Sequence, residues 1–310
     1  MEEIITVNGL KKYFHEVKAV DDISFHVELG ETFGFLGING AGKSTTINML
    51  CTLFPVTAGE VSVCGFKLGK DDEKIRRNIG VVWQNNCLDG RLSVKENLYV
   101  RGSLYGLDRK ALKNRIEEIG KKLQLKDIYQ TRYEKLSGGQ KRRCEIAAAL
   151  INTPKILFLD EPTTGLDPAT RKLVWESMDT LQKEDGTTIF LTTHYMEEAA
   201  CARHIAIIDS GKIKEYGTPF ELKERYAKDK LHLIPNPEKQ DELIQLLKQM
   251  SYQEDNILHT NDRLVISVKD SMFALEILQK VQHCLSGFEM LQGTMDDVFL
   301  NVTGKALKNQ

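Results

Sequence analysis

Short apolar runs and alternating stretches mark the strands expected in the first part of the chain. Ile23, Phe25 and Val27 alternate with polar residues, which predicts one half-buried strand before the turn at residues 29–31. The run from Thr32 to Leu36 is more continuously apolar and predicts a more deeply buried strand. Similar patterns predict further strands over residues 4–10, 59–65, 79–83, 155–159, 187–193, 205–208 and 213–216.

Helical patterns separate these strands. A helix is predicted over residues 43–54, where Pro55 stops it. From Ser93 to about Leu125 the apolar spacing is helical, and Glu96 stands three residues after Ser93, as in a capping box. Further helices are predicted over residues 141–150, 168–183 and 195–202. Strands alternating with helices predict a largely parallel α/β sheet, and the early hairpin indicates an added antiparallel β subdomain.

The residue composition changes near residues 227–239, where Pro235-Asn-Pro237 is typical of a linker region. Beyond it, strands are predicted over residues 231–234, 257–260, 264–268 and 288–291, with helices over residues 238–250 and 273–284. This βαββαβ order predicts a small ferredoxin-like α+β domain. A last helix, residues 295–302, follows an acidic capping box formed by Thr294 and Asp297. We therefore expect a first domain over residues 1–225 and a structural or regulatory second domain over residues 226–310.

Composition limits the cellular compartment and the binding partners that we expect for the chain. The chain has 310 residues and a net charge of -2, which gives no long-range attraction to nucleic acid. No apolar run approaches the roughly 20 residues that span a bilayer, and no secretory signal is visible. The six cysteines form no Cys-x-x-Cys pair and have no His at zinc-ligand spacing. These features predict a cytoplasmic protein with reduced thiols.

A glycine-rich loop follows the strand over residues 32–36 and leads into a helix. This order is the context that a Gly-x-x-x-x-Gly-Lys-Ser phosphate loop requires. Glycines let backbone N–H groups turn toward phosphate oxygens, Lys43 can reach the β- and γ-phosphates, and Ser44 can ligate Mg²⁺. An incidental glycine-rich turn would lack these flanks. The predicted phosphate-binding residues are Gly37, Asn39, Gly40, Ala41, Gly42, Lys43, Ser44 and Thr45.

Two further motifs surround the strand over residues 155–159. The strand ends on Asp160-Glu161, and adjacent carboxylates there are costly unless a metal ion or a reacting group meets them. The sequence Leu136-Ser-Gly-Gly-Gln140 opens a helix, with Ser137 at its N-cap. Backbone amides at such a helix start form a second anion site. The two motifs together favour nucleotide chemistry.

The whole set of motifs resembles the nucleotide-binding subunit of an ABC (ATP-binding cassette) transporter. The resemblance covers about residues 1–225 and rests on the phosphate loop, Gln84, residues 136–140, Asp160-Glu161, Gly165-Leu-Asp167 and His194. It implies an α/β P-loop NTPase cassette with a RecA-like parallel-sheet core. It also implies an antiparallel β subdomain and a helical subdomain that carries the signature motif, residues 136–140.

The resemblance implies ATP and Mg²⁺ as ligands and gives each matching residue a role. Lys43 holds the β/γ-phosphates, Glu161 polarises the attacking water, and His194 contacts the γ-phosphate. Ser44, Gln84 and Asp160 are the implied Mg²⁺-binding residues. Gln84 is also counted among the catalytic residues. Tyr13 is the expected adenine-stacking aromatic, although Phe14 beside it stays open.

In this family the signature motif closes on the γ-phosphate that the other subunit holds, so one cassette carries half of two sites. The residues expected to contact nucleotide in this way are Ser137, Gly138, Gly139 and Gln140, and Asp167 is also expected to bind nucleotide. ATP then joins two cassettes, and hydrolysis releases them. Because the motif set is complete, a homodimer suffices.

The stretch from Thr294 to Gly304 is similar to the tail of cassettes that serve ABC-2 type exporters, the daunorubicin-resistance ATPase group. This resemblance implies a separate transmembrane permease as partner, with contact to the cytoplasmic face of the membrane only through it, and no nucleic acid. The segment from Gln84 to Arg101 is the expected docking site of the permease, with a surface loop as the alternative. The cargo is left open.

Two other functions fit the sequence less well. A soluble ABC-type ATPase that acts on ribosomes or DNA is disfavoured by the single cassette, the lack of a coiled-coil insertion and the lack of a basic arm. A nucleotide-gated regulator, in which the second domain senses a ligand, is disfavoured as a non-hydrolysing switch because Glu161 and His194 are present.

Overall fold

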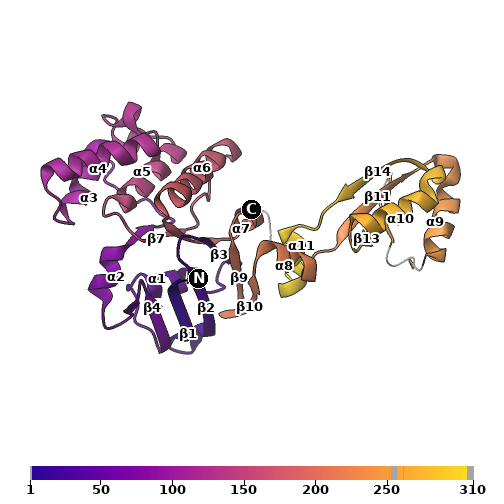
Figure 1. Cartoon of the computed structure of the whole chain (residues 1–310), viewed down its shortest axis with the longest axis horizontal. Coiled ribbons are helices and arrows are strands. Elements are labelled where there is room, and N and C mark those ends of the chain that lie inside the picture. The colour runs from indigo at the N-terminus through magenta and orange to yellow at the C-terminus, as the bar shows by residue number, and fades with distance from the viewer. Residues whose placement is uncertain (1, 251, 253–256, 261, 306–310) are drawn as a thin grey trace. The chain divides into compact units, whose positions relative to one another are not determined.

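The computed structural model describes residues 2–250, 252, 257–260 and 262–305. The chain divides into two compact units, Met1–Pro219 and Phe220–Gln310 (Figure 1). The domain boundary predicted after residue 225 falls inside α8 (Pro219–Tyr226). Across the described ranges, no helix combines the length and the apolar character needed to cross a membrane.

A six-stranded sheet forms the centre of the first unit. Its strands are β10 (Lys212–Gly217), β9 (His204–Asp209), β3 (Thr32–Leu36), β8 (Thr188–Thr193), β7 (Ile156–Asp160) and β6 (Ile79–Val82), in that order. Neighbours from β9 to β6 pair in parallel, and β10 adds an antiparallel edge. Parallel strands place their carboxyl ends at one edge of the sheet, so the segments that follow β3, β7 and β8 meet there.

A second, antiparallel sheet confirms the predicted β subdomain. Its order is β2 (Val17–Glu28), β1 (Glu3–Phe14), β4 (Ala58–Val63) and β5 (Phe66–Lys67). Every pairing in this sheet is antiparallel.

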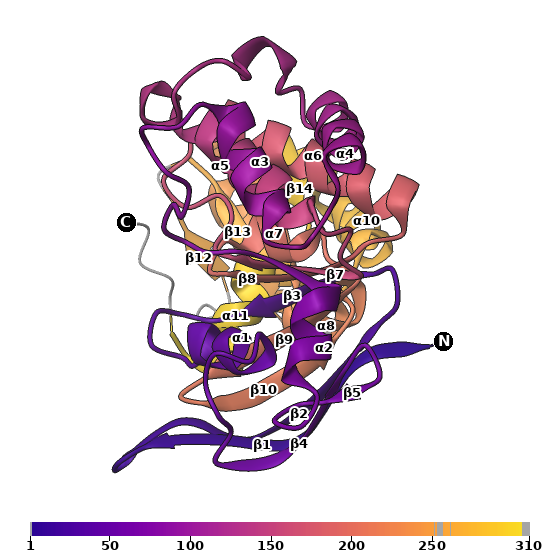
Figure 2. The same ribbon diagram turned by 90° about the vertical axis from the view of Figure 1, so that its left-hand side faces the viewer.

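Helices cover the six-stranded sheet on one side. They are α3 (Val94–Ser103), α4 (Arg109–Lys122), α5 (Gly138–Leu150) and α6 (Pro168–Asp185), while α1 (Lys43–Leu50), α2 (Asp72–Asn78) and α7 (Met196–Ala200) lie elsewhere in the unit. In Figures 1 and 2, α3 to α6 lie on one side of the sheet and the antiparallel sheet lies on the other. Strand β7 serves both cores: Leu157 and Leu159 pack with the helices, and Ile156 and Phe158 pack toward the antiparallel sheet. This alternation is the two-residue period of a strand buried on both faces.

The helix predicted over residues 43–54 ends earlier, at Leu50. The N–H groups of Leu53 and Phe54 both donate to the carbonyl of Asn48. Thr52 adopts a left-handed conformation, with φ at 64°. A left-handed turn therefore ends the helix before Pro55, so the prediction that the proline stops it was wrong.

The helical stretch predicted from Ser93 to about Leu125 is two helices. The first, α3, begins with the predicted capping box between Ser93 and Glu96. Residues 104–108 interrupt the pattern, and the Asp108 side chain then accepts the N–H groups of Lys110 and Ala111 at the start of α4. Apolar spacing continued through the turn, which is why the pattern alone did not reveal the break.

The second unit has the predicted βαββαβ order. It contains β11 (Asp229–Pro235), η3 (Pro237–Lys239), α9 (Gln240–Gln249), β12 (Ile257–His259), β13 (Leu264–Val268), α10 (Ser271–Val281), η5 (Gln282–Cys284), β14 (Leu285–Leu291) and α11 (Met295–Thr303). The sheet is antiparallel in the order β12-β13-β11-β14, as in a split βαβ unit. The predicted capping box of Thr294 and Asp297 begins α11.

Candidate active site

The phosphate loop joins β3 to α1 and is packed tightly against backbone. A Cβ atom on Gly37 would lie 2.5 Å from the carbonyl oxygen of Ile208, and one on Gly42 would lie 2.6 Å from that of Ala19. Gly42 also has a φ of 112°, which side-chain-bearing residues rarely adopt. Glycine is therefore required at both positions for the chain to turn into α1.

Lys43 is held in place inside this loop. Its Nζ donates to the carbonyl oxygens of Gly37 at 2.8 Å and Ile38 at 3.2 Å, and it lies 3.4 Å from Oε1 of Glu161. The side chain is 4% exposed. Burial lowers the pKa of Lys43, and the Glu161 carboxylate acts in the opposite direction. The arrangement places a buried positive charge at the base of the loop.

A pocket of about 490 Å³ opens over the loop. It is lined by Val17, Lys18, Ala19, Asn39, Gly40, Gly42, Lys43, Ser44, Thr45, Gln84, Glu161 and Ser210. The structure thus brings together most of the predicted phosphate-loop residues with Gln84 and Glu161, which are far apart in the sequence. Gly37 and Ala41 belong to the same loop but support the pocket from outside its described lining.

Oxygen atoms converge where a divalent cation is expected. Ser44 Oγ donates to Oδ1 of Asp160 at 3.4 Å, and Thr192 Oγ1 donates to the same oxygen at 2.5 Å. Asp160 is 6% exposed. A hydroxyl and a carboxylate beside the amide of Gln84 are the hard ligands that suit Mg²⁺. The residues present therefore fit that ion.

Glu161 leaves the end of β7 in a strained conformation that turns its side chain into the pocket. Its φ is 46°, and its N–H donates to Oγ1 of Thr192 at 3.1 Å. Its Oε2 accepts from Nε2 of Gln84 at 3.1 Å and from Oγ1 of Thr164 at 3.2 Å. A left-handed residue of this kind costs about 1–3 kcal/mol, so its surroundings must hold it there.

The charge of Glu161 is stabilised by its neighbours. Nδ1 of His194 lies 3.3 Å from Oε1 of Glu161. The contact with His194, followed by the positive charge of Lys43, lowers the pKa of Glu161 to about 2, against the opposing effect of burial. The carboxylate is therefore ionised at neutral pH and can accept a hydrogen bond from water.

His194 directly follows β8, and a buried carboxylate fixes the end of that strand. Glu198, 1% exposed, accepts from Oγ1 of Thr193 at 2.5 Å and from Oγ1 of Thr163. This bond pair ties the end of β8 to the segment after Glu161. Nδ1 of His194 is buried and faces Oε1 of Glu161 at 3.3 Å, a contact that does not have the geometry of a hydrogen bond.

The signature motif caps α5, away from the pocket. Ser137 Oγ accepts the N–H of Gln140 at 3.3 Å, and the Gln140 side chain accepts the N–H of Ser137 at 3.0 Å. Ser137 and Gly138 are exposed, while Gly139 is buried against Thr170 of α6. None of residues 137–140 lines the pocket formed by the described residues. One chain therefore does not bring the signature motif to its own phosphate loop.

Asp167 and Tyr13 also lie outside the pocket lining. Asp167 accepts the N–H of Thr170 at 3.0 Å and so caps α6. The Tyr13 hydroxyl donates to Asp21 at 2.7 Å, and Lys18 lies over the Tyr13 ring. Phe14, the alternative, packs edge-on against Phe54. The adenine-stacking role of Tyr13 stays a prediction.

Two charged residues on α5, Arg142 and Glu145, support the site but were not predicted from the sequence. Arg142 donates to the carbonyls of Trp83 and Pro162 at 2.6 Å and of Asp160 at 3.2 Å. Glu145 accepts the N–H groups of residues 87 and 88 at 2.8 and 3.1 Å, and the hydroxyl of residue 133 at 2.7 Å. Both are buried, and the charged run from Lys141 to Glu145 gave no sign in the sequence of which charges face the interior.

A glycine-rich loop, two carboxylates and a histidine at the carboxyl ends of parallel strands define a P-loop ATPase cassette. The ABC transporter family pattern matches residues 20–164. The chain is 36% identical to the daunorubicin resistance ATP-binding protein DrrA3 of Streptomyces coeruleorubidus, over 97% of this chain and 96% of the relative. It is 33% identical to the linearmycin resistance ATP-binding protein LnrL of Bacillus subtilis, over 99% and 100%.

Among solved structures, the post-hydrolysis state of the ATP-binding cassette MJ0796, dimeric and bound to ADP and Pi, has a TM-score of 0.63. It is 28% identical and covers 69% of this chain and 98% of that chain. The chain belongs to the ATP-binding subunits of ABC transporters. It binds ATP and hydrolyses it to drive transport, in the group whose members are named for daunorubicin and doxorubicin resistance.

Proposed function

We propose that two copies of this chain close on two ATP molecules, each held between one phosphate loop and the signature motif of the other copy. The observation that carries the proposal is the separation within one chain. Lys43, Ser44 and Glu161 line a pocket, while Ser137 and Gly138 are exposed at the start of a helix elsewhere. The dimeric state of MJ0796 supports it, although that state is a property of the related protein.

In the proposed reaction each residue acts through position and charge. Lys43 holds the β- and γ-phosphates, and Glu161 orients a water molecule and accepts its hydrogen bond as an anion. His194 contacts the γ-phosphate. Ser44, Asp160 and Gln84 are the residues that would hold Mg²⁺, which supplies positive charge against the developing negative charge of the phosphates.

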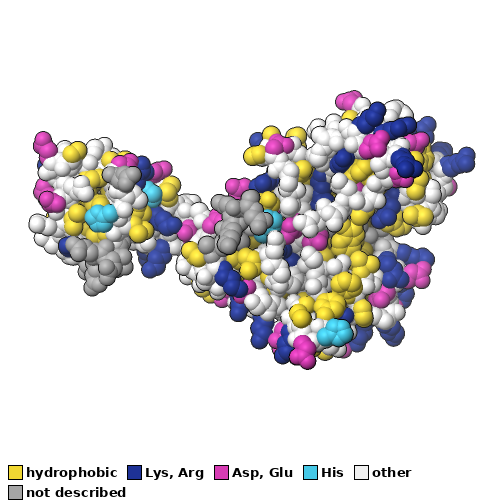
Figure 3. Space-filling view, turned by 180° about the vertical axis from the view of Figure 1, so that it is seen from behind, with side chains coloured by type: hydrophobic (Ala, Val, Ile, Leu, Met, Phe, Trp, Pro, Cys, Tyr) yellow, Lys and Arg dark blue, Asp and Glu magenta, His cyan; other side chains and the backbone are white. Residues whose placement is uncertain are grey.

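The proposed partner is a separate ABC-2 type permease, at which the chain works on the cytoplasmic face of the membrane. Relatives named for resistance to different compounds support an exporter, with the cargo determined by the permease. The proposed docking segment, residues 84–101, is fixed to α5 by Glu145, so movement of the signature helix would reach it directly. On the face shown in Figure 3, basic and acidic side chains are interspersed, which supports a partner other than nucleic acid.

The test uses Glu161→Gln, which removes the charge while keeping the shape of the side chain. We expect ATP hydrolysis to fall by at least about a hundredfold, because the water loses its anionic partner. Light scattering should then show a monomer alone and with Mg-ADP, and a dimer with Mg-ATP. The same variant carrying Lys43→Ala is the matched control and should stay monomeric.

The opposite result is also informative. A Glu161→Gln chain that binds a fluorescent ATP analogue but remains monomeric at all protein concentrations would contradict the homodimer. If that chain formed a dimer only after a different cassette was added, the heterodimer would replace the homodimer in the proposal.

A further inference from the structure

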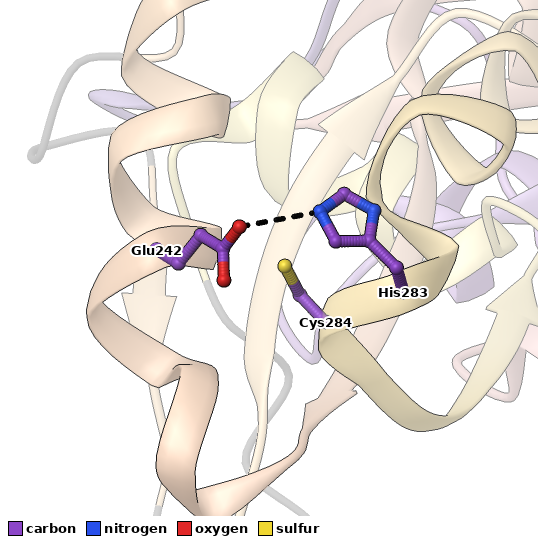
Figure 4. Close-up of side chains that lie close together, drawn as sticks. All are labelled: Glu242, His283 and Cys284. Atoms are coloured by element: carbon purple, nitrogen blue, oxygen red, sulfur yellow. Dashed lines mark ion pairs between the residues drawn. The ribbon is translucent and has the colours of Figure 1, made fainter.

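The second unit brings three metal-ligating side chains together at one point. Glu242 comes from α9, and His283 and Cys284 come from η5 (Figure 4). One oxygen, one ring nitrogen and the sulfur all lie within 4.8 Å of one another. These three residues are close in space through the fold, because about forty residues of sheet and helix separate Glu242 from the other two.

The distances are near those of a tetrahedral site. Nε2 of His283 lies 3.4 Å from Oε1 of Glu242. Two ligands at zinc bond lengths of about 2.0–2.1 Å and a tetrahedral angle stand about 3.4 Å apart, and a sulfur and a nitrogen stand about 3.6 Å apart. The nitrogen and the oxygen are therefore already spaced for a shared ion, and the sulfur requires an approach of at most about 1.2 Å.

The backbone that carries the ligands is fixed, and two of the side chains are free to adjust. Asn236 donates its N–H to the Cys284 carbonyl at 2.8 Å, and Lys239 Nζ donates to the His283 carbonyl at 3.2 Å. Cys284 is fully buried in the core of the unit, whereas the side chains of Glu242 and His283 are about half exposed. The site thus has one buried anchor and two exposed side chains that can close on an ion.

We propose that Glu242, His283 and Cys284 bind a divalent transition-metal ion, with Zn²⁺ the best match. Thiolate, imidazole and carboxylate are all zinc ligands, and a thiolate disfavours Mg²⁺ and Ca²⁺. On binding, the metal–sulfur bond replaces the S–H bond of Cys284 and the proton passes to the solvent. The thiolate and the carboxylate then balance the charge of the ion, and water fills the fourth position.

The other cluster of potential ligands in the described part of the chain is already neutralised. It consists of Glu28, Glu31 and His204. Arg203 lies 3.2 Å from Glu28, and Nδ1 of His204 lies 2.6 Å from Glu31. A permanent guanidinium occupies the place of the cation there, and no thiol is present. In contrast, Lys239 near the proposed site directs its ammonium to a carbonyl.

The metal is expected to stabilise the fold of the second unit. The ion would join α9 to η5 and so link the two ends of a segment that contains two strands and a helix. Binding to the folded unit raises its stability by an amount that grows with the logarithm of the free metal concentration once this exceeds the Kd. This proposal concerns the second unit alone and stands or falls separately from the ATP-dependent dimer.

The test is a titration of the full-length, nucleotide-free chain with Co²⁺, which replaces Zn²⁺ and is coloured. A thiolate ligand produces a charge-transfer band in the near ultraviolet that oxygen ligands at the phosphate loop cannot produce. We expect this band at one equivalent, its loss on addition of Zn²⁺, and its absence in Cys284→Ala. His283→Ala should weaken Co²⁺ binding by at least about tenfold, because three ligands fall to two.

Cys201→Ala, which removes an exposed thiol outside the proposed site, is the matched control and should keep the band. Because His283 is on the surface, His283→Ala should fold normally even if Cys284→Ala does not, and circular dichroism checks both. The proposal is overturned if the wild-type chain shows no charge-transfer band. It is also overturned if the band survives unchanged in His283→Ala and Glu242→Gln.

Discussion

At the scale of single residues, Glu161 depends on contacts from two other segments, at the ends of β6 and β8. The N–H of its strained backbone is held by Thr192, and its carboxylate is held by Gln84 and His194. The carboxylate thus stays ionised while it is nearly buried. Its charge is balanced by contacts that also aim it, which is what a water-orienting residue requires.

This ionisation predicts a specific pH dependence of stability. The pKa of Glu161 in the folded chain is about 2, below its ordinary value of 4.5. A lowered pKa contributes stability above pH 4.5, and the contribution is lost as the pH falls from about 4.5 toward 2. The free energy of unfolding of wild type minus that of Glu161→Gln should therefore shrink over this window, by at most about 3 kcal/mol. Urea unfolding of both chains at several pH values measures the difference, and a difference independent of pH would contradict it.

The signature glycines predict different tolerance of a methyl group. A Cβ on Gly139 would lie 2.1 Å from Cγ2 of Thr170, whereas one on Gly138 would lie 3.3 Å from the end of the Leu166 side chain. Gly139→Ala should force α5 and α6 apart and cost about 1–3 kcal/mol. Gly138→Ala is the matched control and should melt within a few degrees of wild type by differential scanning calorimetry. Equal melting temperatures for the two variants would argue against this packing.

Residues in local motifs were predictable, and residues that act across the sheet were not. Lys43 and Ser44 belong to one contiguous loop whose spacing implies its geometry. Thr192 looked like an ordinary β-branched strand residue, and its contact with Asp160 exists only because β7 and β8 are neighbours. Sequence order does not give strand order, so that contact could not be predicted.

At the scale of elements, helix α5 connects the signature motif to the proposed docking segment. Its first residue follows Ser137, and two turns later Glu145 receives the amides of Cys87 and Leu88. Arg142, between them, donates hydrogen bonds to the carbonyls of Trp83, Asp160 and Pro162, which are next to Gln84 and Glu161 in the sequence. A rigid helix can carry a displacement from its first residue to contacts two turns further along.

Removing the Glu145 carboxylate should loosen that segment selectively. In Glu145→Ala the amides of Cys87 and Leu88 lose a charged acceptor, which costs about 2–3 kcal/mol. Amide hydrogen exchange over residues 84–92 should then accelerate by more than about tenfold, while α1 stays protected. Glu134→Ala, an exposed carboxylate close by in the sequence, is the control and should leave the exchange unchanged. Uniform acceleration across the chain would instead indicate global destabilisation.

Element types were predictable, but several of their ends were not. The capping boxes at Ser93 and Thr294 marked two helix starts directly, because the signal is local. The end of α1 at Leu50 and the break before Asp108 depend on left-handed turns that polar and apolar spacing does not encode.

At the scale of the whole molecule, each unit has its own apolar core. Among the described residues, the apolar cluster of the second unit is built from residues 231–290, and the two clusters of the first unit are built from residues 4–216. A chain that ends at Pro219 should therefore remain folded and bind ATP. Circular dichroism melting and a fluorescent ATP analogue test this, with the full-length chain as control. An unfolded fragment would show that the cassette relies on the second unit.

The exposed start of the signature helix, at Ser137 and Gly138, has a consequence for populations of molecules. If each pocket is completed by a second copy, turnover per chain declines on dilution, and rate depends on how often two competent copies meet. A variant that binds ATP but cannot hydrolyse it would then sequester functional copies. In a cell that makes both forms, fully functional pairs decline with the square of the functional fraction, so one defective allele would be partly dominant.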